Sequence, residues 1–123
     1  MPIIVCENRV GLKAEVKAEI ARKVTTAIQE IIRSPLDLIS VVFHDLDAQS
    51  TYRSGRPTTD TLIFCHLRDG RSDGAILSLI KEVSAIWSAC TGDSEDNIEV
   101  AAALYPARHV VRAGERLPEA PRV

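Results

Sequence analysis

The second residue of the chain, Pro2, stands where a proline could carry acid–base chemistry. It precedes the apolar, β-prone run Ile3-Ile4-Val5-Cys6, so we expect it to begin a buried strand, a place where proline is tolerated. If Met1 is removed, Pro2 bears a free secondary amine, and burial or a nearby cation would lower its pKa from the usual range of about 7.7–8.0. Such an amine is a general base near neutral pH. If Met1 is retained, Pro2 is only the start of a strand.

Two arginines, Arg68 and Arg71, stand three positions apart where the third predicted strand runs into the second predicted helix. The planar guanidinium binds a carboxylate through two N–H groups, and the first turn of a helix also favours anions. These arginines therefore predict a site for a small carboxylate substrate beside Pro2. The alternative is that both arginines are solvated or paired with Asp69 and Asp73.

Composition and charge indicate a single globular domain, residues 1–123, and exclude several classes of protein. Apolar residues make up 46% and charged residues 26% of the chain, which is ordinary for a globular protein. The formal net charge of −2 gives no reason to expect nucleic acid or an anionic membrane as a partner. No apolar run is long enough for a membrane span, and charges from Lys13 onward argue against a signal peptide. We expect a cytoplasmic protein.

The cysteines and histidines do not form a metal-binding pattern. The three cysteines, Cys6, Cys65 and Cys90, are odd in number and lack the CxxC spacing of metal sites and redox motifs. We therefore expect reduced, mostly buried thiols and no metal. His44 and His66 lie at predicted strand ends and are interpreted as structural or surface residues.

Hydrophobic periodicity predicts two helices, each placed between two strands. Apolar residues from Leu12 to Ile31 recur every three or four positions, which is typical of a helix with one buried face, and Ser34-Pro35 ends it. Ser72 can cap a second helix and Gly92 can end it. We predict helices over 12–33 and 73–90, strands over 2–8, 38–45, 61–67 and 97–104, a polar loop over 46–59 with room for a short hairpin, and an aperiodic tail from Tyr105.

The two halves of the chain match at a constant offset of 59 residues. No gap is needed across either predicted helix, which favours an internal duplication. The pseudo-repeats are residues 2–46 and 61–105, followed by a C-terminal tail over 106–123. Chance matching of apolar positions is the alternative. The matches that favour duplication most are Arg9 with Arg68, Gly11 with Gly70, and Asp37 with Asp96.

This order of elements predicts an α/β fold built from tandem β-α-β units. A crossover helix makes the two strands of each unit parallel and its connection right-handed. Two units then form a four-stranded sheet with both helices on one face. Apolar residues fall on both faces of the strands, so the uncovered face needs a second cover. Self-association is the simplest cover.

The Met-Pro start on a strand, the doubled β-α-β pattern and the Arg-x-x-Arg spacing together resemble the tautomerase superfamily. The most similar group is that of cis-3-chloroacrylic acid dehalogenase, which the stretches 60–72, 105–107 and 114–118 resemble in particular. The resemblance covers nearly the whole chain. It implies a tautomerase or MIF-like fold, a homotrimer of the 4-oxalocrotonate tautomerase-like type, and an isomerase whose catalytic residue is the N-terminal proline. It also implies a substrate carboxylate bound by Arg68 and Arg71, with no metal or organic cofactor.

The chain departs from that group at three positions. Ile28 stands where the dehalogenases carry a helix histidine, Ala101 where they carry a strand tyrosine, and Arg112 where they carry the glutamate that activates water. An arginine cannot accept that proton, so dehalogenase or hydratase activity of the parent type is expected to be weak or absent. Arg112, His109, Ile28 and Ala101 are possible pocket residues. Arg112 would lower the proline pKa further or favour a dicarboxylate, or it points into solvent.

Together these features predict an enzyme that tautomerises a small 2-oxo or unsaturated carboxylate. Pro2 would be the acid and base, while Arg68 and Arg71 would hold the carboxylate and stabilise charge on an enolate oxygen. One alternative is a cis-3-chloroacrylate dehalogenase or hydratase with an altered site. The other is a non-catalytic trimer that binds anions, which a retained Met1 would favour because the proline nitrogen would then be an amide.

Overall fold

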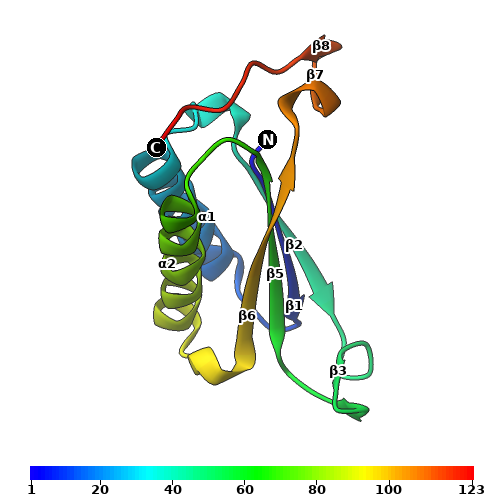
Figure 1. The fold of residues 1–123 in the computed structure, drawn as a ribbon. Helices are drawn as coiled ribbons and strands as arrows, with labels where there is room; N and C mark the ends of the chain where they lie inside the picture. Colours follow the sequence, from blue (N-terminus) through cyan, green and yellow to red (C-terminus); the bar gives the residue numbers. More distant parts are fainter.

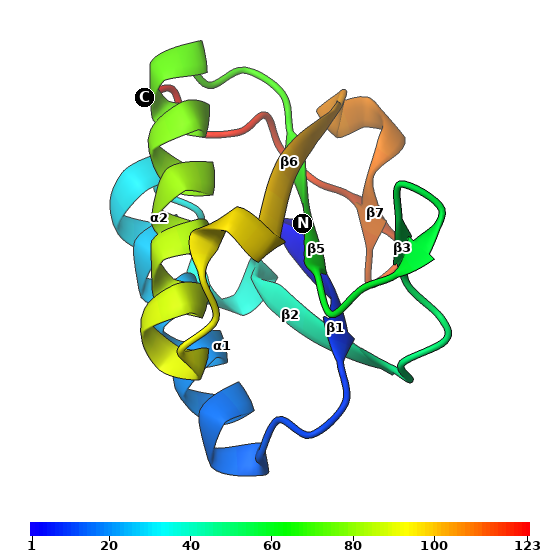
Figure 2. The same ribbon diagram turned by 90° about the horizontal axis from the view of Figure 1, so that it is seen from below.

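The computed structural model describes all 123 residues and contains one four-stranded sheet with two helices on one of its faces (Figure 1, Figure 2). The strand order is β2-β1-β5-β6, and two short hairpins lie outside the sheet. No helix is both long and apolar enough to cross a membrane. The elements in chain order are β1 (Ile3–Arg9), α1 (Ala14–Ile32), η1 (Leu36–Leu38), β2 (Ser40–Leu46), β3 (Tyr52–Arg53), β4 (Arg56–Pro57), β5 (Thr61–Arg68), α2 (Asp73–Thr91), η2 (Glu95–Asn97), β6 (Ile98–Tyr105), η3 (Ala107–His109), β7 (Val111–Arg112) and β8 (Glu115–Arg116), the η elements being single 3-10 turns.

The two helices end where the sequence signals predicted. The Ser72 hydroxyl accepts a hydrogen bond from the Ala75 amide at 3.2 Å, which caps the start of α2. Gly92 ends α2 in the left-handed region, at φ 79°, where glycine carries no steric penalty. Arg33 takes the same conformation at the end of α1, at φ 57°, directly before the predicted stop at Ser34. Both crossover helices therefore have defined ends.

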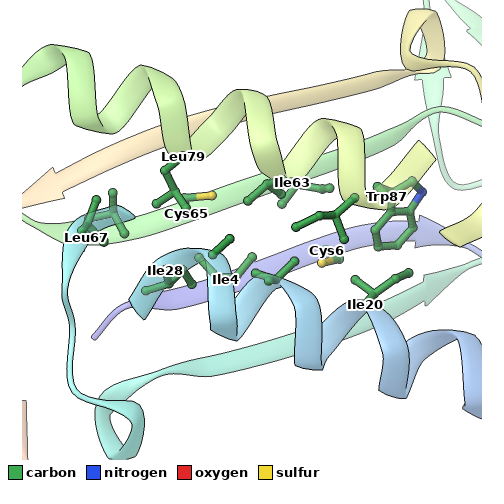
Figure 3. Close-up of a cluster of buried hydrophobic side chains, with 14 residues drawn as sticks. Ile4, Cys6, Ile20, Ile28, Ile63, Cys65, Leu67, Leu79 and Trp87 are labelled. Atoms are coloured by element: carbon green, nitrogen blue, oxygen red, sulfur yellow. The ribbon is translucent and has the colours of Figure 1, made fainter. Parts of the chain in front are cut away.

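The centre of the sheet is the antiparallel pair of β1 and β5. β1 also pairs in parallel with β2, and β5 with β6, so each half of the chain is a β-α-β unit. This confirms the predicted architecture. Alternate residues of the central strands face the helices and form the core. Figure 3 shows the two layers meeting at Ile4, Cys6, Ile20, Ile63, Cys65, Leu79 and Trp87.

The core contains two of the three cysteines, all of which are free thiols. Cys6 and Cys65 are buried on the helix side of the central strands, and burial raises the pKa of each thiol to about 12. A thiol with so high a pKa has almost no reactive thiolate at neutral pH. These cysteines therefore act as small core residues, as the sequence predicted, while Cys90 is only partly buried.

The face of the sheet opposite the helices is apolar and uncovered in the single chain. It exposes 36% of Ile3, 46% of Val42 and 41% of Phe64, which come from three neighbouring strands. In Figure 2 the helices lie on one side of the sheet and the hairpin segments β3 and β7 on the other. We call this surface the open face. Its apolar character agrees with the predicted need for a second cover.

The second half of the chain repeats the structure of the first at the offset found in the sequence. Ile3 pairs with Ser40 in the first unit, and Leu62 pairs with Glu99 in the second. Leu62 and Glu99 lie 59 residues after Ile3 and Ser40, respectively. The helices, 3-10 turns and hairpins follow the same offset. Residues 107–116 of the predicted aperiodic tail form η3 and the β7–β8 hairpin, whose strands of two residues are too short to show periodicity in the sequence. The duplication itself remains a prediction, which this register supports.

Candidate functional site

The chain start lies at one end of the sheet, between the strands that carry the predicted site residues. Pro2 is buried, and its carbonyl accepts a hydrogen bond from the Ser40 amide at 3.0 Å, which holds it beside the start of β2. On the other side of β1, Ile3 pairs with His66 near the end of β5. The antiparallel arrangement of the two units thus brings Pro2 toward the strand end that carries Arg68.

Arg68 is the last residue of β5, and only 1% of it is exposed. Its side chain leaves the sheet on the side away from the helices, because the preceding residue, Leu67, faces the core. The C-terminal segment returns from β8 across this end of the sheet toward the helices (Figure 1), and Arg68 Nη1 donates to the Pro118 carbonyl at 2.8 Å. The other two guanidinium nitrogens, Nε and Nη2, are buried and have no hydrogen-bond partner. Their N–H groups have the spacing of the two oxygens of a carboxylate, and in the single chain other protein atoms cover them.

Positive charge surrounds the amine at the chain start. Burial lowers the pKa of the Met1 amine, and the charges of Arg68 and Arg112 lower this pKa further. Burial also lowers the pKa of Arg68, an effect that the nearby Glu119 carboxylate opposes. The guanidinium groups nevertheless stay charged at neutral pH. This end of the sheet therefore combines a weak base with a place for an anion.

Arg112 lies on β7 at the edge of this site. Its side chain is exposed, yet it is close enough to the Met1 amine to lower the pKa of that amine. The other end of the sheet has the matching arrangement, in which Arg53 of the β3–β4 hairpin binds Asp60, with Nε and Oδ2 3.2 Å apart. Asp60 corresponds to Met1 in the repeat, and Arg53 corresponds to Arg112. The first hairpin thus places its arginine beside a carboxylate, and the second places its arginine near an amine. Arg112, unlike Arg53, is in no ion pair, so its positive charge acts on the amine.

Arg71 has partners that the sequence did not predict. It is buried, with 6% exposed, and its guanidinium donates from Nε to the Ile32 carbonyl at 3.3 Å, from Nη1 to the Arg68 carbonyl at 3.0 Å and from Nη2 to Ser34 Oγ at 2.8 Å. The reason is that α1 ends beside it, and the last carbonyls of a helix have no partner within the helix. The Arg71 guanidinium is thus hydrogen-bonded to the end of α1, to Ser34 and to the backbone of Arg68.

Three of the possible pocket residues take other places. Ile28 is a fully buried core residue between α1 and the sheet, so it offers no surface to a ligand (Figure 3). Ala101 is exposed on the open face, where it pairs with Phe64 in the middle of β6. His109 is exposed in η3. The apolar stripe of α1 and the alternation of β6 determine the first two positions.

Sequence reasoning missed the contacts of the tail and a polar pair on the open face. Glu119 belongs to the segment after the β7–β8 hairpin. The Arg-x-Gly sequence occurs at 53–55 and again at 112–114, and this repetition could have revealed the hairpin. The His66 ring and the Tyr105 hydroxyl lie 2.9 Å apart, measured from Nδ1 to Oη. His66 thus has a structural partner, which no local pattern in the sequence indicates.

This arrangement suits proton transfer on a small carboxylate. Arg68 offers two unpartnered N–H groups for the carboxylate, and the amine at the chain start can accept a proton. No three side chains of His, Cys, Asp or Glu gather to form a metal site. None of the cavities of the single chain is lined by Met1 or Pro2.

Comparisons with known proteins find one family model and several solved structures of similar fold. A family model described as Tautomerase enzyme matches residues 6–61. The structure superposes with a TM-score of 0.92 on N1, a member of the cis-3-chloroacrylic acid dehalogenase family, at 24% identity over 97% of this chain and 85% of that one. No curated protein sequence matches significantly.

Two further solved structures have the same fold. Pt0534, inactivated by 2-oxo-3-pentynoate, gives a TM-score of 0.86 at 24% identity, with 92% of this chain and 93% of that one covered. A fused 4-OT, described as a wild-type symmetric trimer, also gives a TM-score of 0.86, at 18% identity over 91% of this chain and 92% of that one. At such identities the likeness concerns the fold.

Proposed function

We propose that the chain is a member of the tautomerase superfamily, whose family model matches residues 6–61, and that it tautomerises a small 2-oxo or unsaturated carboxylate, with Pro2 as acid and base once Met1 is removed. The observation that carries the proposal is the unpartnered Nε–Nη2 edge of Arg68, buried at the end of the sheet where burial and two arginines lower the pKa of the terminal amine. Removal of Met1 would place the amine on the buried Pro2, one residue further along the chain, and the proposal is that burial and the nearby arginines lower the pKa of that amine as well.

In the proposed reaction only protons move. The Pro2 amine takes a proton from the enol oxygen, or from a carbon of the conjugated system, and a proton is returned at the other end of that system. Arg68 binds the carboxylate through two N–H groups, and its charge stabilises the negative charge that develops on the enolate. Arg112 adds positive charge near the same amine. The atoms of substrate and product are the same, so no co-reactant is required.

The solved relatives support this substrate class. Pt0534 is inactivated by 2-oxo-3-pentynoate, a 2-oxo acid whose alkyne is conjugated to the ketone and is therefore open to attack by an amine. A carboxylate next to a 2-oxo group is also the shape that one guanidinium edge binds well. We extend to this chain the expectation that a 2-oxo acid is bound beside the amine.

The test is ketonisation of the enol of phenylpyruvate by untagged protein, with removal of Met1 measured on the same sample by intact mass. We expect a rate well above that of buffer when the mass lacks Met1. A buffer-like rate from such protein would refute the tautomerase and favour the anion-binding module. Release of halide from cis-3-chloroacrylate would favour the dehalogenase alternative, which the likeness to N1 motivates, although Arg112 cannot replace a carboxylate base.

Replacement of Arg112 by alanine is expected to move the pH dependence of kcat/KM toward higher pH. The basic form of the amine exists above its pKa, so the activity rises as the pH passes through that pKa. The Arg112 charge lowers the pKa of the terminal amine, and its removal therefore raises this pKa, while burial and Arg68 still act to lower it. Arg116→Ala on the same hairpin is the matched control. Superimposable pH profiles for Arg112→Ala and wild type would exclude this role for Arg112.

The proposal includes a homotrimer in which the open face is the contact surface between subunits. Its exposed apolar residues, Ile3, Val42 and Phe64, need a cover that the single chain does not supply. A fused 4-OT with the same fold is described as a symmetric trimer. A neighbouring subunit would also add a wall to the amine site, which no cavity of the single chain encloses.

Phe64→Glu is expected to convert the trimer into monomers. The substitution puts a carboxylate at the centre of the open face, and burying it without a partner in an interface costs several kcal/mol. Sedimentation velocity measures the change. Leu77→Glu, at another exposed apolar position, on α2, is the matched control and should keep the wild-type mass. Trimers of Phe64→Glu would show that the open face is not the interface.

A further inference from the structure

A histidine and a tyrosine on the open face lie beside Arg68 and have no task in the reaction described above. The His66 ring and the Tyr105 hydroxyl are 2.9 Å apart, from Nδ1 to Oη. That reaction takes one proton from the substrate and returns another at the opposite end of the conjugated system. We propose that His66 exchanges this second proton with the substrate while Pro2 exchanges the first, and that Tyr105 orients the His66 ring. The inference rests on the proposed function.

The strand geometry places His66 on the same face as Arg68. Both residues belong to β5 and stand two positions apart, and successive side chains of a strand point to opposite faces of the sheet. Cys65 and Leu67 are buried in the core on the helix side. The side chains of His66 and Arg68 therefore leave the sheet on the open face, with about 7 Å between their backbone positions.

The neighbouring strands bring the chain start and Tyr105 to the same place. On one side of β5, His66 pairs with Ile3, the residue after Pro2. On the other side, Arg68 pairs with Tyr105. Figure 1 shows the chain start and the ends of β5 and β6 at one end of the sheet. Because neighbouring strands lie about 5 Å apart, a small 2-oxo acid bound through its carboxylate by Arg68 is long enough to place its other carbons beside Pro2 and His66.

The surroundings of His66 hold its ring and leave one ring nitrogen for a ligand. The side chain is half-buried, and the rings of Phe64 and Tyr105 lie beside it, with centroids 6.4 Å and 5.7 Å from that of His66. Tyr105 binds Nδ1, whereas Nε2 has no hydrogen-bond partner in the protein. The bond at one ring nitrogen determines which form the other takes. An acid–base residue oriented by a further side chain is the arrangement that proton transfer requires.

The proposed step moves two protons and leaves no other change. In the ketonisation of an enol, the Pro2 amine takes the enol proton, and the electron pair left on oxygen forms the carbonyl. The electron pair of the carbon–carbon double bond takes a proton from Nε2 of the protonated His66 ring and forms a C–H bond. Tyr105 Oη accepts the Nδ1 hydrogen of that ring. Water then removes the proton from Pro2 and supplies one to His66, so no co-reactant is consumed.

The test compares variants with wild type in ketonisation of the phenylpyruvate enol in heavy water. His66→Gln keeps a polar side chain that is no acid, and should lower kcat about 10²-fold with little change in KM. Tyr105→Phe keeps the aromatic packing and loses the hydroxyl, and should lower kcat about threefold to tenfold. The matched control is His44→Gln, which removes a histidine that pairs with Glu7 toward the other end of the sheet and should behave like wild type.

The second measurement is the configuration of the deuterated product, trapped at once as phenyllactate by a coupled dehydrogenase and determined by NMR. Wild type should add deuterium to one face of the double bond, because a ring held in place delivers it. His66→Gln should give a mixture of both configurations, because water then delivers the deuterium. Sedimentation velocity on the same samples shows whether each variant keeps the assembly of wild type.

Three results would overturn the inference and leave the proposed function intact. The first is an active wild type with a His66→Gln variant of equal kcat. The second is a slower His66→Gln variant whose product keeps the wild-type configuration, since His66 would then affect the rate without delivering the proton. If His66→Gln does not keep its assembly, Tyr105→Phe decides, and an unchanged kcat is the third. A wild type no faster than buffer would instead refute the proposed function and, with it, the task assigned to His66.

Discussion

Protein that carries one additional glycine in front of Pro2 is expected to lose about 10²–10⁴-fold in kcat/KM for ketonisation of the phenylpyruvate enol. The added residue turns the proline nitrogen into an amide without basicity near neutral pH. It leaves the ring of Pro2, the strand and Arg68 in place, so the loss isolates the basic nitrogen. The measurement compares this protein with processed wild type under identical conditions.

Two controls make this result specific to Pro2. Pro2→Ala keeps a terminal amine after removal of Met1, so it should lose less activity than the glycine extension does. The alkyne of 2-oxo-3-pentynoate should add to the Pro2 amine of processed protein, which increases the mass of the N-terminal peptide by the whole reagent because no group leaves. The extended protein should remain unlabelled. Equal activity of extended and processed protein would show that another residue is the base.

The architecture could be predicted because local signals and global topology agree. Ser72 and Gly92 are short-range signals whose meaning does not depend on the rest of the fold, and the structure places them at the ends of α2. The spacing of strands and helices then leaves few topologies, since a crossover helix makes each strand pair parallel. The register of the two halves, down to the pairing of Leu62 with Glu99, follows the offset that the sequence shows.

The site was harder to predict because a guanidinium is defined by the acceptors it finds. The acceptors of Arg71 at Ile32 and Ser34 are 39 and 37 residues away in the sequence, so no local motif contains them. At Ile28 two predictions competed: the resemblance assigned the position to the pocket, while the helix stripe assigned it to the core. The structure follows the stripe, since a fully buried isoleucine is held by core packing.

The repeat also explains why the chemistry would be confined to one end of the sheet. Arg9 corresponds to Arg68, but it pairs with Asp93 at 3.1 Å instead of keeping a free edge. Arg53 corresponds to Arg112, but it pairs with Asp60. Carboxylates thus neutralise the arginines at the end without an amine. At the other end the matching arginines have no carboxylate in contact, and a substrate carboxylate can take that place.

Arg68→Met is expected to abolish carboxylate binding while it leaves the protein at least as stable. Loss of the bidentate contact should lower kcat/KM by about 10³-fold, mainly through KM. The free energy of unfolding should stay the same or rise by about 1–3 kcal/mol, because methionine has similar length and no buried N–H groups, whereas Arg68 keeps two of its nitrogens without partners. Steady-state kinetics and urea unfolding at one pH measure the two effects.

Arg68→Lys keeps the positive charge but loses the planar guanidinium. Its activity should lie between those of wild type and Arg68→Met, with a loss of about 10-fold to 100-fold in kcat/KM. A strongly destabilised Arg68→Met protein would instead make Arg68 a structural residue, whose bond to the Pro118 carbonyl holds the tail. If Arg68→Met keeps its stability and loses carboxylate binding, Arg68 serves binding at the expense of folding. A buried cation with two unsatisfied donors costs folding free energy, so its presence is explained by a ligand that satisfies those donors.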